Sequence, residues 1–352
     1  MAITVRDIAK ESGVSPGTVS RVLNNRANVK EDTRKKILNV INKLQYNPLD
    51  NMPLAKRVQP TTIGLCIPYP DTISPYYSRA IHSAMRNTNQ NNYSCSLFSE
   101  FDFNNHSNNG EQGGVNKILS CDGLILFSIV REYGQYLKVL SQQAKPVVLV
   151  KRKSPFPDVP VIYDDDYAGS MLAMDHLHSL GHRNIGYIGV NGNENFKDRP
   201  GIKEYSSKRM GAYDDFRKAH GLEFSSYLFY LGAKPRGPDD FKQGLAEIME
   251  RPENPTAFFC AGDFYAIETI KNLRQAGIRV PEDIAIVGYN NDYTAQIHSP
   301  GITTVNIPVE EMMDQAYKMI FKMIKGEALE VSEIKMNNKL IVRESCGASL
   351  KK

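Results

Sequence analysis

Hydrophobic positions follow a helical period in the first sixty residues and a different pattern after them. In "SPGTVSRVLNN" (residues 15–25), Val19, Val22 and Leu23 recur at i, i+3 and i+4, which predicts a helix with one apolar face. Ser15 can cap this helix, and Pro16 suits its first position. The opposite face carries small and polar side chains and one arginine: Gly17, Ser20, Arg21 and Asn24.

Two more helices are predicted beside this one. Thr4 and Asp7 have the spacing of a capping box at the start of "VRDIAKES", and Gly13 ends that helix. A third helix is predicted over "EDTRKKILNVINKLQY", which closes a small core with Ile37 and Leu44. The first two helices are separated only by a short Gly-containing turn. They therefore predict a helix-turn-helix unit, in which the second helix enters the major groove of DNA.

From residue 61 onward, short β-rich apolar runs alternate with amphipathic helical stretches. The predicted strands are "TIGLCIP", "YSCSLF", "DGLILF", "PVVLV", "NIGYIGV", "SYLFYLG", "TAFFCAG", "IAIVGYN" and "ITTVNIP". The predicted helices are "SRAIHSAMRNTNQ", "AGSMLAMDHLHSLGH", "FYAIETIKNLRQAGI" and "MDQAYKMIFKMI". This alternation predicts an α/β fold with doubly wound parallel sheets, and the length of the segment favours two lobes.

The pattern predicts four segments along the chain. They are a helix-turn-helix head (residues 1–45), a hinge or linker (46–60), a two-lobed domain (61–346) and a tail (347–352). Lobe 1 is expected to hold about 61–162 plus 292–322, and lobe 2 about 163–291 plus 323–346.

The positive charge lies almost entirely in the predicted head and hinge. Residues 1–60 hold eleven Lys and Arg against five Asp and Glu, which leaves 32 against 34 in the rest of the chain. A basic head on a neutral body is expected for a protein that binds nucleic acid. No apolar run approaches the roughly 20 residues needed to span a bilayer. The start "MAITVRDIAK" lacks the apolar core of a secretory signal, which predicts a cytoplasmic protein.

Sequence signatures of enzymes and metal sites are missing. There is no phosphate-binding glycine loop, no G-x-S-x-G and no H-E-x-x-H, and the seven histidines do not cluster with carboxylates. The five cysteines include no C-x-x-C pair. We therefore expect no cofactor, no metal and no enzymatic activity.

The head as a whole resembles that of the lactose-repressor (LacI/GalR) family of bacterial transcription regulators. The resemblance lies in "ITVRDIAKESGVSPGTVSRVLNN" and "VKEDTRKKILNVINKLQYNP". It implies that DNA is contacted by Thr4, Ser15, Pro16, Gly17, Thr18, Ser20, Arg21 and Asn24. Pro16 and Gly17 have no side-chain donor, so discrimination between bases would depend on Arg21, a bidentate partner for guanine, and on serine or threonine side chains.

The connector "YNPLDNMPLAKRVQP" departs from the family pattern, which has a helix with a leucine that wedges into the minor groove. Pro53 falls inside this helix and should break or restart it. Ala55 occupies the wedge position, and Leu54 lies one residue early. Either Leu54 wedges in a shifted register or the hinge helix does not form, while Lys56 and Arg57 can still contact phosphates.

The body resembles the ligand-sensing core of the same family, which is similar to periplasmic sugar-binding proteins. The motifs include "PVVLVKR", "HLHSLGHRNIGYIG", "PTAFFCAGD" and "GIRVPEDIAIVGYNN". Such a core implies a small ligand between the lobes, at the carboxyl ends of the strands. The positions carried over as effector-binding are Ser74, Tyr76, Tyr77, Lys151, Arg152, Arg209, Asp263 and Asn290.

Several of these positions have lost the acceptors that bind neutral sugars. Lys151 and Asn290 replace carboxylates, and Gly262 and Ile307 replace amides. Three cations, at 151, 152 and 209, would then lie where few acceptors remain, which favours an anionic effector such as a sugar acid or phosphosugar. In the alternative, Lys151 faces solvent or pairs with Asp164, Asp165 or Asp166, and the effector is an ordinary sugar.

The resemblance implies a repressor of a carbohydrate-catabolic operon that binds double-stranded operator DNA as a homodimer, or as a tetramer, under the control of a small effector. An alternative is a sensor of a small molecule or of a partner protein that binds DNA only weakly because its hinge is divergent.

Overall fold

The structure is a computed structural model of the chain. It describes residues 4–23, 29–44, 46, 61–68, 75–99, 117–127, 140, 145–153, 157–190, 200–223, 226–229 and 238–348. The chain forms two compact units, residues 1–60 and 61–352, and each is described by itself.

The first unit is a three-helix head, as the sequence predicts. It contains α1 (Val5–Ser12), α2 (Pro16–Leu23) and α3 (Glu31–Lys43). The capping box is present, because the Thr4 hydroxyl accepts from the Asp7 amide at 3.3 Å and the Thr4 amide donates to the Asp7 carboxylate at 2.8 Å. Gly13 ends α1 in the left-handed conformation, with φ of 67°, where glycine is favoured. The buried apolar side chains of the head are Ile8, Ala9, Val19, Val22, Ile37 and Tyr46.

Lobe 1 of the second unit is built on a six-stranded parallel sheet. The strands are β1 (Thr62–Ile67), β2 (Ser94–Ser99), β3 (Gly123–Phe127), β4 (Val147–Val150), β5 (Val161–Asp164) and β11 (Glu333–Met336), in the order β11-β5-β4-β3-β1-β2. Helices α4 (Pro75–Gln90) and α13 (Val309–Ile324) pack against each other and against this sheet. Strands β3 and β4 are buried throughout, which explains their continuous apolar sequences.

Lobe 2 has a second six-stranded sheet, parallel except for β12. Its order is β12-β10-β9-β8-β6-β7. The strands are β6 (Ile185–Gly189), β7 (Tyr227–Phe229), β8 (Ala257–Cys260), β9 (Ala285–Asn290), β10 (Thr303–Asn306) and β12 (Lys339–Ile341). The helices are α8 (Asp166–Ser179), α9 (Pro200–Ala219), α10 (Pro238–Met249), α11 (Asp263–Gln275) and α12 (Tyr293–Ile297), followed by a short 3₁₀ turn, η4 (Glu344–Cys346).

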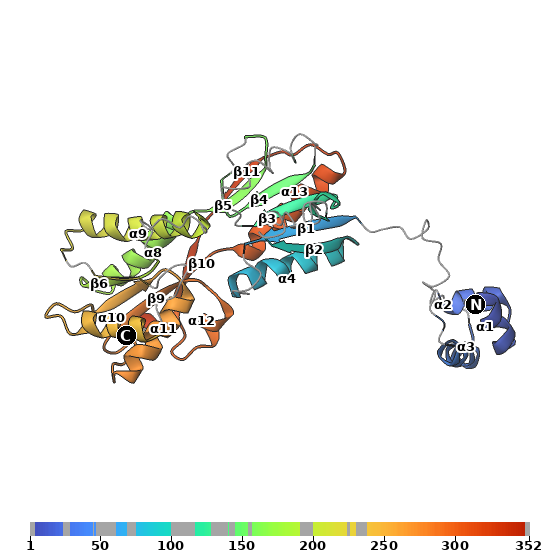
Figure 1. Cartoon of the computed structure of the whole chain (residues 1–352), viewed down its shortest axis with the longest axis horizontal. Coiled ribbons are helices and arrows are strands. Elements are labelled where there is room, and N and C mark those ends of the chain that lie inside the picture. The colour runs from blue at the N-terminus through green and yellow to red at the C-terminus, as the bar shows by residue number, and fades with distance from the viewer. Residues whose placement is uncertain are drawn as a thin grey trace, which may run out of the picture. The chain divides into compact units, whose positions relative to one another are not determined.

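The chain passes between the lobes three times, after β5, after β10 and after β11 (Figure 1). The expected division of the lobes is therefore wrong at two places. Strand β10 lies in lobe 2, where Thr303 pairs with Val287 of β9, and β11 lies in lobe 1, where Ile334 pairs with Ile162 of β5. Hydrophobic periodicity identifies a buried strand such as β10, but it carries no information about which of two sheets the strand joins.

Every strand named from the sequence is present, whereas β5, β11 and β12 were not predicted. Strand β11 alternates exposed and half-buried residues at the edge of its sheet, so its sequence, EIKM, resembles a surface loop. One buried apolar cluster contains residues from both sheets, including Tyr76 of α4, Met210 of α9 and Tyr289 of β9. The lobes thus share a core at their junction, where the carboxyl ends of β4, β5, β8 and β9 are found.

Candidate functional site

The outer face of α2 is the candidate nucleic-acid interface. Pro16, Gly17, Ser20 and Arg21 are exposed, whereas Val19 and Val22 are buried against the rest of the head. The Ser15 hydroxyl accepts a hydrogen bond from the Thr18 amide at 3.2 Å and lies 2.9 Å from the Thr18 hydroxyl, so it caps the helix as predicted. The helix is therefore fixed by its apolar side and presents a polar side to solvent.

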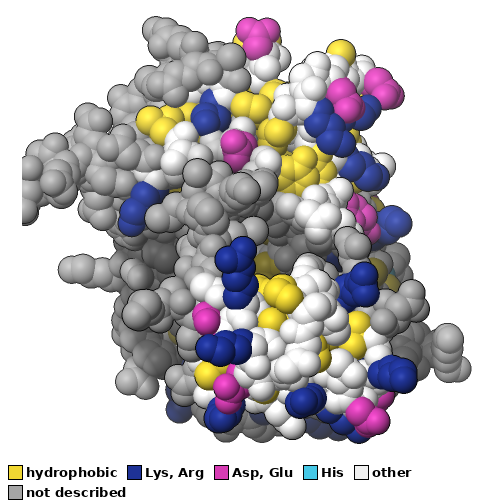
Figure 2. All heavy atoms as spheres, turned by 90° about the vertical axis from the view of Figure 1, so that its right-hand side faces the viewer, with side chains coloured by type: hydrophobic (Ala, Val, Ile, Leu, Met, Phe, Trp, Pro, Cys, Tyr) yellow, Lys and Arg dark blue, Asp and Glu magenta, His cyan; other side chains and the backbone are white. Residues whose placement is uncertain are grey.

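Thr4 has a defined structural role in the head, which is to cap α1. Its hydroxyl also donates to the Asp7 carboxylate at 2.6 Å. The predicted DNA contacts at Asn24 and at the four connector positions 54–57 lie outside the described residues, as does Ser74 of the predicted effector site. Figure 2 shows Lys and Arg side chains at several separate places on the described surface, with Asp and Glu among them.

Because Thr4 supplies the N-terminal cap of α1, Thr4→Ala is expected to destabilise the head by about 1 kcal/mol. Amide hydrogen exchange of the intact chain would report this as faster exchange in peptides of α1. Thr4→Ser keeps the hydroxyl and should exchange as the wild type does. Equal exchange in the alanine variant would mean that the cap contributes nothing measurable.

The second candidate site lies between the lobes, where a buried charged cluster joins β4, β5, α8 and α9. Lys151 follows β4 with φ of 81°, and its ammonium group donates to Asp164 and, at 3.2 Å, to Asp166. Arg209 donates to Asp166 at 2.7 and 3.1 Å and to the Ala261 carbonyl at 2.6 Å. All four side chains are at most 8% exposed. Two cations and two carboxylates thus form a balanced set.

The expectation of a cationic surplus is therefore wrong for Lys151 and Arg209, and the stated alternative, pairing with Asp164 and Asp166, is observed. The physical reason is that β4 and β5 are neighbouring parallel strands, with Val150 opposite Ile162. The acidic run after β5 consequently arrives at the same edge of the sheet as Lys151. Burial raises the pKa of Asp166, but Lys151 and Arg209 outweigh that effect and hold its pKa well below the ordinary value.

Two side chains that sequence reasoning missed complete the cluster. The Tyr289 ring lies 3.7 Å from the Arg209 guanidinium carbon, a cation–π contact. The Asn338 amide donates to Asp164, to the Asp165 carbonyl and to the Tyr289 hydroxyl, each at 3.0 Å. Gly169 of α8 packs so closely here that a Cβ would collide with the Tyr289 hydroxyl. Tyr289 lies within the motif "GIRVPEDIAIVGYNN", directly before the predicted effector position Asn290, whereas Asn338 lies in no quoted motif and had no signal in the sequence.

Tyr76 and Tyr77 lie on the lobe 1 side of this cluster. Their rings are 5.2 Å apart, and that of Tyr76 is 5.5 Å from Phe127. Tyr76 is buried and Tyr77 is half-buried. Burial, and then the charge of Asp164, raise the pKa of Tyr76 well above its ordinary value, so the hydroxyl stays neutral. The predicted aromatic residues and the buried charges therefore meet at the junction of the lobes.

The other predicted effector positions lie at or just after the ends of β4, β8 and β9. Asp263 begins α11, is fully buried, and accepts a hydrogen bond from the Asp292 amide at 2.7 Å. Asn290 ends β9 with φ of 105°. Arg152 is half-buried directly after Lys151. Burial, and then the charge of Asp292, raise the pKa of Asp263 to about 8, whereas burial raises the pKa of Asp292 to about 6.

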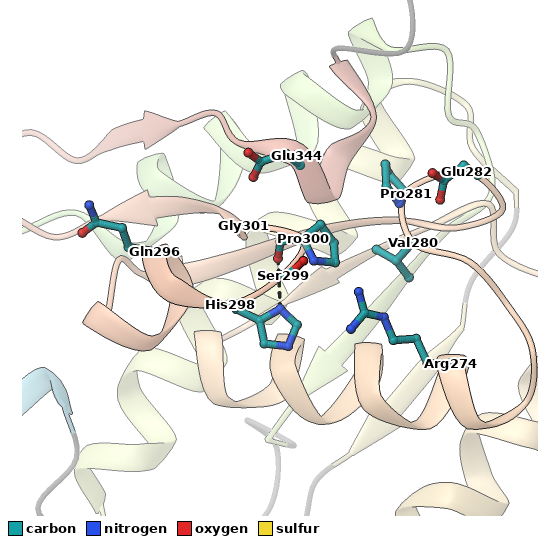
Figure 3. Close-up of a pocket in the computed structure, with 10 residues that line it drawn as sticks. All are labelled: Arg274, Val280, Pro281, Glu282, Gln296, His298, Ser299, Pro300, Gly301 and Glu344. Carbon is teal, nitrogen blue, oxygen red and sulfur yellow. Dashed lines mark hydrogen bonds between the residues drawn. The ribbon is translucent and has the colours of Figure 1, made fainter.

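Two hollows of different character lie in the described part of lobes 1 and 2. One of about 230 Å³ opens beside the charged cluster and is lined by Lys151, Lys153, Tyr163, Asp164, Asp165, Lys208 and Lys335. A larger one of about 500 Å³ lies at the opposite edge of the lobe 2 sheet, where residues 280–281 precede β9 and residues 300–301 precede β10. In Figure 3, His298 is hydrogen-bonded to the Pro300 carbonyl there, and Arg274 lies near the prolines. Ligands of open α/β sheets bind at the carboxyl ends of strands, so the smaller hollow belongs to the candidate site.

Within the described residues, no group of three or more metal-ligating side chains is found, and no helix is long and apolar enough to cross a membrane.

Comparisons with known proteins agree with this arrangement. Residues 4–49 match the lacI family of bacterial regulatory proteins, and residues 174–346 match the periplasmic binding protein-like domain. The NTD biosynthesis operon regulator NtdR of Bacillus subtilis is 31% identical over 97% of this chain and 99% of its own length. A solved structure of the transcriptional regulator CelR in complex with cellobiose has 25% identity and a TM-score of 0.63, over 97% of this chain and 99% of that one.

A structure of the Lac repressor dimer bound to operator has the same fold, with a TM-score of 0.65 at 19% identity over 98% of this chain and 99% of that chain. The relatives are regulators of transcription and not enzymes. The chain therefore belongs to the lacI family of bacterial regulatory proteins and is a DNA-binding transcriptional regulator.

Proposed function

We propose that the protein is a repressor that binds operator DNA in the cytoplasm through α2 of the head and whose affinity for DNA is set by a small effector held between the lobes. The observation that carries this proposal is the division of α2 into a buried apolar side and an exposed polar side with Arg21. A short capped helix of this kind suits the major groove, where an arginine can read guanine. We extend the proposal to the other predicted DNA contacts, including Asn24 and the connector.

A twofold dimer is part of this proposal. The Lac repressor structure with the same fold is a dimer bound to operator. Two heads related by a twofold axis would read half-sites about one helical turn, or roughly 34 Å, apart. The expected operator is therefore palindromic.

Arg21→Ala is expected to weaken binding to the preferred duplex by about 1–3 kcal/mol, because a bidentate contact to guanine would be lost. Fluorescence anisotropy of the full chain with a duplex from its own upstream region, against scrambled duplex, would measure this at several salt concentrations. Lys35→Ala, at an exposed position of α3, is a control that should affect both duplexes equally. An equal loss on both duplexes for Arg21→Ala would contradict base reading by this residue. No preference of the wild type for its own duplex would instead favour a sensor that binds DNA weakly.

The proposed effector is a neutral carbohydrate, which agrees with control of a carbohydrate-catabolic operon. Lys151 and Arg209 are already paired with Asp164 and Asp166, so these two buried cations need no anionic effector to balance them. Tyr77 is half-buried and can pack against a sugar, and the buried ring of Tyr76 supports it from behind. The similar regulator CelR is known in complex with cellobiose.

Calorimetric titration of the full chain with neutral sugars, uronates, aldonates and phosphosugars tests the effector class. Binding of a neutral sugar, weakened in Tyr77→Ala, is the expected result. Binding of the charged members alone would overturn the neutral class and favour the sugar acids or phosphosugars.

A further inference from the structure

The side chain of Arg79 crosses from lobe 1 to lobe 2. Arg79 lies in the first turns of α4, one helical turn after Tyr76, and its side chain is 17% exposed. Its guanidinium donates to Glu310 at 2.7 Å from Nε and 2.5 Å from Nη2. The remaining donors reach the Asn290 carbonyl at 2.8 Å and the Ile307 carbonyl at 3.0 Å. One planar group thus makes a two-pronged ion pair and two bonds to backbone.

The partners of Arg79 belong to three different parts of the body. Glu310 lies on α13 in lobe 1, Asn290 is the last residue of β9 in lobe 2, and Ile307 lies in the crossover between β10 and α13. Rotation of one lobe about this crossover would have to change at least one of these contacts. A rigid guanidinium fork holds several acceptors in fixed directions, which an ammonium group cannot do.

The contact also stabilises an unusual backbone conformation at the cleft. Asn290 has φ of 105°, which non-glycine residues adopt only where their surroundings hold them. The carbonyl of this residue is the one that accepts from Arg79. Arg79 also donates to the Asn306 side chain at 3.4 Å. The network continues from Asn306, which accepts from Asn291 at 3.0 Å, while Asn291 accepts from Arg343 at 2.8 Å.

We propose that Arg79 is a positioning residue that fixes the relative placement of the two lobes, by tying the helix that carries Tyr76 and Tyr77 to the strand end that carries Asn290. Arg79 would then hold the two faces of the cleft in register, in addition to the shared apolar core and the pair of Lys151 with Asp166. The relevance of this register to sensing rests on the proposed effector cleft, whereas the positioning itself can be tested without any effector.

The chain provides a matched control on the same helix. Arg86 of α4 pairs with Asp314 of α13 at 2.6 Å, and both residues lie in lobe 1. Arg86→Ala therefore removes an arginine and an ion pair from the same helix pair without removing a hydrogen bond to lobe 2. A purely structural role for Arg79 in packing α4 on α13 would make the two alanine variants alike.

The test is an interlobe distance measurement on the full chain by double electron–electron resonance. Spin labels would be attached through Lys318→Cys on α13 and Gln275→Cys on α11, both exposed positions, one in each lobe. The five native cysteines are buried or half-buried. Because the chain is expected to be a dimer, labelled chain would be mixed with an excess of unlabelled chain, so that a dimer carries one labelled protomer. The wild type and Arg86→Ala should then each give one narrow distance population. Arg79→Ala should lose that narrow population, and Arg79→Lys should lose it as well, because an ammonium that pairs with Glu310 cannot also span both carbonyls.

A narrow population in both Arg79 variants would overturn the proposal. A broad population in Arg86→Ala would do the same, since any loosening of α4 would then suffice. If Arg79→Ala fails to fold, the distance distribution of Arg79→Lys decides the test alone. A narrow distribution in Arg79→Lys would overturn the proposal, because it would show that the ion pair with Glu310 is sufficient. The calorimetric titration decides the effector cleft separately, so failure of either idea can be recognised by itself.

Discussion

Replacing Asp166 with alanine is expected to lower the free energy of unfolding of the body by about 3–5 kcal/mol, because it leaves Lys151 and Arg209 buried with one carboxylate between them. Asp166 accepts from both cations, and its side chain is 8% exposed. Removing the Asp166 carboxylate takes away the acidic partner of the Arg209 guanidinium, and water cannot replace it because the site is buried. Urea unfolding of the full chain at neutral pH, followed by circular dichroism, measures the loss.

Asp165→Ala is the control for this experiment. Asp165 is the adjacent carboxylate, but it caps α8 and pairs with Lys335, whose side chain is 49% exposed. Its loss should cost only about 1 kcal/mol, the usual value of a helix cap. If Asp166→Ala fails to fold, Asp166→Asn retains a hydrogen-bond acceptor and should lie between the alanine variant and the wild type. Losses of the same size in Asp165→Ala and Asp166→Ala would show that the buried cluster contributes no more than a surface pair.

How far the sequence predicts this molecule depends on whether the controlling interactions are local. The outer face of α2, the cap at Thr4 and the turn at Gly13 follow from residues that are neighbours along the chain, and all three are present. The buried strands can be predicted equally well, because in an α/β sequence a short continuous apolar run is typical of a strand in a parallel sheet that is covered on both faces.

The composition of the cleft could not be predicted in the same way. Carrying family positions across named Lys151 and Arg209 together, and the structure places both in the buried cluster at the junction of the lobes, but the net charge there depends on Asp166, a partner outside that set. The same holds for Asn338, which reaches the cluster only because the chain crosses between the lobes for a third time after β11. Long-range pairing of charges is a property of the strand order, and periodicity along the chain does not contain it.

Buried carboxylates near the cleft should make stability depend on pH, and this dependence is expected to be the second large effect. Asp263 is fully buried, and its pKa is raised from 3.8 to about 8 by burial and by the nearby Asp292. Between these two pKa values, the folded chain holds a proton that the unfolded chain has released. Stability must therefore fall as pH rises through this window, by about 1.4 kcal/mol per pH unit for one full proton. Asp292, with a pKa of about 6, contributes in the same direction at the acidic end of the window.

Asp263→Asn cannot ionise, so it should lose most of this slope and become more stable than the wild type near pH 8, while the difference between the two proteins should be small only near pH 4, at the acidic end of the window. Urea unfolding of both proteins across this range gives the difference directly. Taking the difference matters because burial lowers the pKa of His176, a shift that favours the folded state as pH rises and so opposes the slope in both proteins equally. Asp314→Asn is the control: Asp314 is the half-exposed partner of Arg86, and its replacement should leave the pH dependence of the free energy of unfolding as in the wild type. A wild type whose stability is flat or rises over this range, in parallel with Asp263→Asn, would mean that Asp263 is ionised in the folded protein and that its charge is balanced by groups such as Arg343.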